Sequence, residues 1–113
     1  MTILLIDDLR NFRVAPEGEL VIARTSQEAL DYLTAHEDDH FSEIWLDHDL
    51  GETDTIMRVV DYLNERAFFD NHVDVDVIYI QSSNPVGVKQ MLAGFERYGY
   101  RAQRVDANKI FVV

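Results

Sequence analysis

The chain has 113 residues, of which 47% are hydrophobic and 11% aromatic, so it has enough apolar material for one folded domain and is not expected to be disordered. Its 10 basic and 21 acidic residues give a formal net charge of −11, which excludes a broad basic surface for nucleic acid. There is no cysteine, and hence no disulfide or thiolate metal site. We expect a cytoplasmic protein, because the first residues do not form a signal peptide and no apolar stretch has the roughly 20 residues that a membrane span needs.

The first apolar run, residues 3–6, is typical of a short buried strand and ends in two carboxylates, Asp7 and Asp8. Residues 11–19 contain a proline and a glycine and lack helical periodicity, so we expect a loop there or at most one helical turn. The first helix of an alternating strand and helix pattern is therefore predicted to be missing or shortened.

A second apolar strand is predicted at residues 20–23, and a helix follows it. Thr25 and Glu28 form a capping box, in which a hydroxyl and a carboxylate bind free N–H groups of the first turn, and the helix is predicted to run to about His36. After the next strand, Asp54 is expected to cap another helix. The apolar face of that helix has helical spacing: Ile56, Val59, Val60, Leu63 and Ala67.

The strand between these two helices forms the centre of the chain. It is an apolar run, Ile44 to Leu46, that ends abruptly in Asp47, His48 and Asp49, and a Leu-Gly pair that can turn the backbone follows. Trp45 is expected to be a core residue before it is a platform for base stacking. Asp47 is expected at the carboxyl end of the strand, where open α/β sheets place their sites.

The last third of the chain continues the alternation. A β-branched strand at residues 75–80 ends in polar residues that include Ser82, and Asn84 with Pro85 is typical of a helix start. The helix is expected to bury Val88, Met91, Leu92 and Phe95 and to end at Gly99. Two final extended segments, residues 101–105 and 110–113, are predicted to form an antiparallel hairpin at the sheet edge. An exposed Phe111 would allow two copies to pair there as a homodimer.

The fold predicted from this order is a single α/β domain covering residues 1–113, with three layers around a mainly parallel five-stranded sheet. The carboxyl ends of its strands would bring Asp7, Asp8 and Asp47 together. Several carboxylates in one pocket repel one another unless a hard divalent cation neutralises them, and Mg²⁺ is the expected cation. Together with a hydroxyl and amides that receive phosphate oxygens, such a site is suited to phosphoryl chemistry.

Each candidate site residue, taken alone, also has a structural interpretation. Asn84 is as well explained by helix capping as by ligand contact, and Ser82 alone would be an ordinary loop hydroxyl. His48 is either a half-buried structural histidine or a proton carrier of the site. Arg10 is either a surface charge or a phosphate partner, which is plausible in so acidic a chain. Asp7 and Asp47 are harder to dismiss, because a carboxylate that follows a buried strand needs compensation for its lost hydration.

Three motifs of the chain belong together: Asp7-Asp8-Leu9-Arg10, Asp47-His48-Asp49-Leu50-Gly51 and Ser82-Ser83-Asn84-Pro85-Val86-Gly87. They resemble the motifs of the cyclic-phosphate-processing family of receiver-like domains, which is related to response-regulator receivers and has a flavodoxin-like fold. The likeness covers nearly the whole chain. By this resemblance Asp7 and Asp8 match the acidic pair that holds Mg²⁺, Asp47 matches the phosphoacceptor and Ser82 the hydroxyl. Ordinary receivers have a Lys-Pro pair after the last strand; here neither Lys89 nor Lys109 precedes a proline, so phosphorelay is not expected.

The resemblance implies a Mg²⁺-dependent phosphoesterase that processes a cyclic phosphate of a nucleotide or RNA end. In this hypothesis Asp47, His48 and Asp49 carry the catalysis, while Arg10, Ser82 and Asn84 bind the phosphate. The family often has His before the serine of its third motif, and here Gln81 stands there. This replacement favours the alternative hypothesis, a non-catalytic signalling or binding module that senses a phosphorylated ligand or binds a protein partner.

Overall fold

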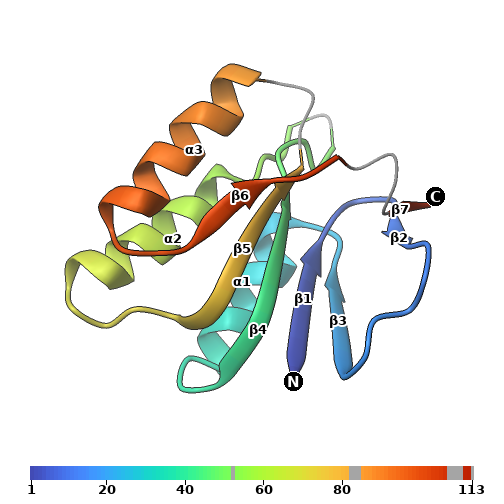
Figure 1. The fold of residues 1–113 in the computed structure, drawn as a ribbon, viewed down its shortest axis with the longest axis horizontal. Helices are drawn as coiled ribbons and strands as arrows, with labels where there is room; N and C mark the ends of the chain where they lie inside the picture. The colour runs from blue at the N-terminus through green and yellow to red at the C-terminus, as the bar shows by residue number, and fades with distance from the viewer. Residues whose placement is uncertain (52, 82–84, 107–110, 113) are drawn as a thin grey trace.

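A computed structural model describes residues 1–51, 53–81, 85–106 and 111–112. A five-stranded, fully parallel sheet in the order β3-β1-β4-β5-β6 runs through the molecule (Figure 1). This is the strand order of the flavodoxin-like receiver fold, and the predicted α/β domain is confirmed. Its strands are β1 (Thr2–Ile6), β3 (Glu19–Ala23), β4 (His40–Asp47), β5 (Asp74–Gln81) and β6 (Ala102–Arg104).

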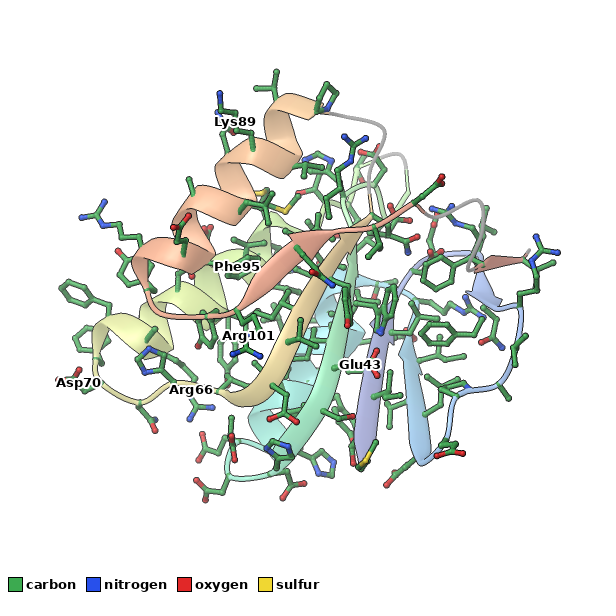
Figure 2. All side chains as sticks on the ribbon, in the orientation of Figure 1. Glu43, Arg66, Asp70, Lys89, Phe95 and Arg101 are labelled. Atoms are coloured by element: carbon green, nitrogen blue, oxygen red, sulfur yellow. The ribbon has the colours of Figure 1, made fainter. Side chains whose placement is uncertain are left out.

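The described helices are α1 (Ser26–Ala35), α2 (Met57–Phe68) and α3 (Pro85–Arg97). They share one face of the sheet, where their apolar residues form a single buried core with every second residue of the central strands, such as Leu4, Ile44 and Ile78. Phe95 of α3 is fully buried in this core (Figure 2). None of the described helices has the length and apolar character that crossing a membrane requires.

The opposite face of the sheet has a small aromatic core of its own. Ile3, Leu5 and Trp45 of the sheet pack there with Phe12 and Phe111, and Glu43 lies on the same side and accepts a hydrogen bond from the Trp45 indole (Figure 2). A two-stranded antiparallel sheet of β2 (Asn11–Phe12) and β7 (Phe111–Val112) contributes the last two rings. The expected third layer is therefore this small sheet, because the described residues contain no helix between β1 and β3. The prediction of a missing first helix is confirmed.

The predicted C-terminal hairpin is wrong. β6 pairs in parallel with β5, whereas β7 pairs in antiparallel fashion with β2, and Figure 1 shows this pair on the β3 side of the main sheet. The physical reason is burial: Phe111 is only 3% exposed, because its ring fills the aromatic core that the missing helix leaves uncovered. For the same reason Phe111 is not the exposed residue that was expected to pair two copies.

The helix starts agree with the sequence only in part. The Thr25 side chain accepts a hydrogen bond from the Glu28 amide at 3.0 Å, as the capping box predicts. Asp54 does not cap α2, whose cap position is taken by Ile56 without a side-chain hydrogen bond. The Asp54 carboxylate instead accepts hydrogen bonds from the amide and the hydroxyl of Ser26, and so caps α1 from a neighbouring loop. Pro85 begins α3 and Gly99, with φ +87°, follows its end as predicted, while Asn84 lies outside the described residues.

Candidate metal and phosphate site

Three carboxylates meet at the carboxyl edge of the sheet. β1 and β4 are parallel neighbours with Ile6 opposite Leu46, so Asp7 and Asp47 leave the two strands at the same level. Asp7, Asp8 and Asp47 each offer one oxygen, and these three oxygens lie within 4.8 Å of one another. The structure thus brings together the carboxylates that the sequence predicted as metal ligands.

Asp7 is fully buried and its carboxylate is held by four donors. One oxygen, Oδ1, accepts the backbone amides of Leu9 and Arg10 at 3.0 and 2.8 Å, which fixes the turn that follows β1. The other, Oδ2, accepts the side-chain amide of Gln81 at 2.7 Å and lies 3.3 Å from Nε of Arg10. These donors compensate the lost hydration that makes a buried carboxylate costly.

Asp47 is the less well compensated of the two buried carboxylates. Burial, the charge of Asp7 and, to a smaller extent, that of Asp8 raise its pKa from 3.8 to about 6. Arg10 and a long hydrogen bond from the Asp49 amide, 3.4 Å, oppose this rise. The pocket therefore has more negative charge than its own cation balances, a property that favours binding of a divalent cation.

Arg10 is the cation that faces the carboxylates. Its Nη2 lies 3.7 Å from Asp47 and its Nε lies 3.3 Å from Asp7, so the guanidinium spans the two strand ends. A second arginine holds the backbone: Nη1 of Arg24 donates to the carbonyl oxygens of Asp7 and Arg10 at 3.2 and 2.8 Å. The prediction that Arg10 belongs to the site agrees with this placement, and its role toward phosphate stays a prediction.

The donor set fits a hard divalent cation. All three side chains offer carboxylate oxygens, the ligand type that Mg²⁺ and Ca²⁺ prefer, and the cluster contains neither sulfur nor imidazole. Asp8 is half-buried whereas Asp7 and Asp47 are buried, so the cluster opens to solvent on the side of Asp8.

The remaining predicted residues divide into two groups. His48 and Asp49 bind each other, with Nδ1 of the imidazole 3.0 Å from the Asp49 carboxylate, and the Asp49 side chain is 73% exposed. No contact between these two side chains and the carboxylate of Asp7 or Asp47 is found in the described part of the chain. Ser82 and Asn84 lie outside the described residues, so their place in the site stays a prediction.

Sequence reasoning missed three contributors to the site. Gln81 was noted only for the histidine it replaces, yet it stands opposite Asp47 in the sheet register and reaches Asp7. The signal that could have found Gln81 is its position as a polar residue at the end of an apolar strand. Arg24 and Phe111 had no such signal, because their contacts with Arg10 join segments far apart in the sequence.

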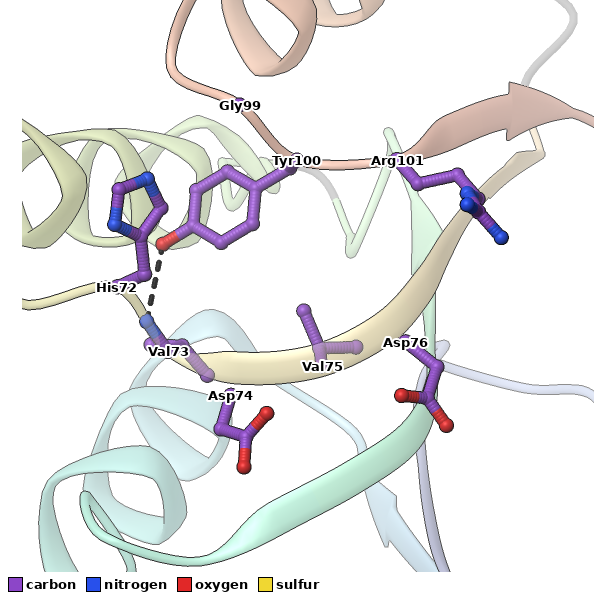
Figure 3. A pocket seen from close by; sticks show the side chains of 8 residues that line it. All are labelled: His72, Val73, Asp74, Val75, Asp76, Gly99, Tyr100 and Arg101. Carbon is purple, nitrogen blue, oxygen red and sulfur yellow. Dashed lines mark hydrogen bonds between the residues drawn. The ribbon is translucent and has the colours of Figure 1, made fainter.

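A hollow of about 800 Å³ lies at the other end of the sheet, where β5 begins (Figure 3). Its polar groups are used in structural contacts. The Tyr100 hydroxyl accepts the Val73 amide and donates to the Leu63 carbonyl, and His72 contacts the Tyr98 carbonyl. We therefore assign the site to the carboxylate cluster and not to this hollow.

Comparison with known proteins assigns the chain to a family. No curated protein and no solved structure matches the chain. The family model described as "Cyclic-phosphate processing Receiver domain" matches residues 2–97, which contain all of the carboxylates described above. The chain belongs to the family of cyclic-phosphate processing receiver domains.

Proposed function

We propose that this chain is a Mg²⁺-dependent phosphoesterase that opens the cyclic phosphate of a nucleotide or an RNA end. The observation that supports it best is the cluster of Asp7, Asp8 and Asp47, with Arg10 as the cation beside two of them. The membership of the family supports a cyclic phosphate as the class of substrate. The cluster gives the chemistry, because carboxylates that hold a metal beside a guanidinium suit the charge of a phosphoryl group.

In this proposal Asp7, Asp8 and Asp47 hold Mg²⁺, which would offset the charge that develops on the phosphate. Arg10 binds a phosphate oxygen from the same side, and Ser82 and Asn84 supply further donors. Gln81 keeps the Asp7 carboxylate in its orientation through the 2.7 Å hydrogen bond. Asp7 is buried at the end of its strand and held by four donors, so its carboxylate needs little reorganisation when the substrate binds.

Ring opening requires that water adds to phosphorus and that one ring P–O bond breaks, with a proton taken from the water and given to the leaving oxygen. His48 and Asp49 are the pair assigned to this proton transfer. The Asp49 carboxylate at Nδ1 orients the imidazole and leaves Nε2 for proton exchange. Alternatively, a carboxylate oxygen of Asp47 attacks phosphorus, one ring P–O bond breaks and its oxygen takes up a proton, and water then hydrolyses the acyl phosphate so formed and restores the carboxylate.

The test is end-group analysis of an RNA oligonucleotide with a 2′,3′-cyclic phosphate, together with a panel of cyclic nucleotides. The wild-type protein is compared with Asp47→Asn, with and without Mg²⁺. Ring opening that needs both the metal and Asp47 is the expected result. An Asp47→Asn variant that retains full activity would contradict the assignment. Asp49→Asn tests the assigned proton transfer, because it weakens turnover only if the His48–Asp49 pair carries the proton.

A second candidate function is a sensor that binds a phosphorylated ligand without turnover. The observation that favours it is Gln81, since a neutral amide that cannot carry a proton stands where the family often has a histidine. Treatment with acetyl phosphate in the presence of Mg²⁺ distinguishes the two. A stable adduct at Asp47, detected by mass spectrometry, without ring opening of any cyclic phosphate would support the sensor.

A further inference from the structure

The C-terminal strand of this chain reaches the candidate site. β7 lies beyond residues 2–97, the range that the family model matches. It pairs with β2, which directly follows Arg10: Asn11 stands opposite Val112, and Phe12 opposite Phe111. The end of the chain is therefore attached to the turn that carries the cation of the site, about a hundred residues away in the sequence (Figure 1).

Arg10 and Phe111 are in contact, with the guanidinium over the aromatic ring. The guanidinium carbon of Arg10 lies 5.8 Å from the centre of the Phe111 ring, within the range of a cation–π interaction. Asp7 and Asp47 contact the same guanidinium. Arg10 is thus held both by two carboxylates and by an aromatic ring.

The ring is itself fixed. Phe111 is 3% exposed and packs against Phe12 at 5.1 Å and, edge to face, against Trp45 at 5.4 Å. Arg13 donates to its carbonyl oxygen at 3.4 Å, which ties the strand to the same turn. The Arg10 side chain, in contrast, is 29% exposed, so without the ring it has solvent to turn into. In the contact between Arg10 and Phe111, the Phe111 ring is therefore the fixed partner.

We propose that Phe111 is a positioning residue of the site: its ring holds the Arg10 guanidinium beside Asp7 and Asp47, where a phosphate oxygen would meet it. The part that concerns phosphate rests on the function proposed above. The placement of Arg10 does not rest on it. Phe111 acts through Arg10 and contacts no reacting atom.

The experiment uses Phe111→Leu in the full chain, with Phe12→Leu as the matched control. Phe12 belongs to the same aromatic core, but in the described part of the chain the Arg10 guanidinium stacks on Phe111 and not on Phe12. The first measurement is the exchange rate of the Arg10 Nε–H proton by NMR, without metal or ligand. We expect exchange about three- to tenfold faster in Phe111→Leu and a smaller change in Phe12→Leu, which loosens the support of the Phe111 ring but leaves that ring beside the guanidinium.

Equal effects of the two substitutions, or no effect of Phe111→Leu, would overturn the proposal. If Phe111→Leu does not fold, a ring-fluorinated phenylalanine at position 111 keeps the shape but removes the negative ring face. This substitution is also expected to raise the exchange rate of the Arg10 Nε–H proton above that of the wild type. An unchanged rate would overturn the proposal.

A second measurement separates this proposal from the proposed function. Binding of Mg²⁺ alone and of a 2′,3′-cyclic nucleotide with Mg²⁺ is measured by calorimetry for each protein. Phe111→Leu is expected to weaken nucleotide binding about three- to tenfold and to leave Mg²⁺ binding unchanged. If the wild-type protein binds no cyclic nucleotide, the proposed function fails, while the exchange rate of Arg10 still decides the role of Phe111.

Discussion

The unbalanced charge of Asp47 leads to a prediction about stability. Asp47→Asn removes the charge but keeps the shape of the side chain and its acceptor for the Asp49 amide. A pKa raised from 3.8 to about 6 by burial and by Asp7 means that ionised Asp47 destabilises the folded state by about 3 kcal/mol above pH 6. This net shift already includes the opposing attraction of Arg10, whose Nη2 lies 3.7 Å from the Asp47 carboxylate. We expect Asp47→Asn to be more stable than the wild type by about 3 kcal/mol at pH 7.5.

The sign follows from proton binding. Between pH 3.8 and about 6 the folded protein binds more protons at Asp47 than the unfolded chain does, so this residue's contribution to stability falls with rising pH and is constant above pH 6. The assay is urea unfolding of both proteins from pH 4 to pH 7.5 with a chelator present. Asp49→Asn is the control, because that carboxylate is 73% exposed. If Asp47→Asn is no more stable than the wild type at pH 7.5, the reasoning about burial and repulsion is refuted.

Metal binding should cancel most of this difference. If Asp47 ligates the cation, saturating Mg²⁺ stabilises the wild type, by about 2.7 kcal/mol at a hundred times its Kd, and stabilises Asp47→Asn much less. The measurement is the same unfolding curve at pH 7.5 with increasing Mg²⁺. Equal stabilisation of the two proteins would show that the cation binds elsewhere.

Three further predictions concern residues around the site and the edges of the fold. Gln81→Leu should destabilise the protein by about 1–3 kcal/mol in urea unfolding without metal, because the buried carboxylate of Asp7 loses its 2.7 Å donor. Asp54→Ala should cost about 1 kcal/mol in the same assay, since α1 loses the cap on its first turn, whereas Asp54→Asn should recover part of this loss. His40 has a pKa raised mainly by its hydrogen bond to Asp74, so the difference in melting temperature between wild type and His40→Ala should be largest below pH 6.5 and shrink as pH rises further.

The position of the carboxylates could be predicted because it depends on one rule of sheets. A short apolar run that ends in an aspartate predicts a buried parallel strand, and adjacent parallel strands end at one edge. This rule alone predicted that Asp7 and Asp47 lie together. The spacing of apolar residues alone predicted the helices. The register that places Gln81 opposite Asp47 follows from the same parallel pairing.

The errors have a different physical origin. A strand of two residues has no periodicity, so the partner of β7 is decided by which apolar surface is left uncovered, and local sequence does not report that surface. Asp54 was assigned to the helix that follows it, because a capping residue is recognised from its neighbours in the sequence. In the structure the first turn of α1 lies beside its loop and takes the carboxylate instead. The partner of β7 and the helix that Asp54 caps both depend on contacts between segments distant in the sequence, and these contacts exist only in the folded protein.

The missing first helix connects these observations. Asp7, Asp47 and Gln81 follow Leu5, Trp45 and Tyr79 by two residues along their strands, and since side chains alternate, all three point to the face that carries no described helix. The main core, on the other face, holds the sheet and the three helices together without these residues. The small aromatic core contributes less to the fold, yet it contains the ring on which Arg10 stacks. Substitutions in that core should therefore change the placement of Arg10 before they unfold the domain.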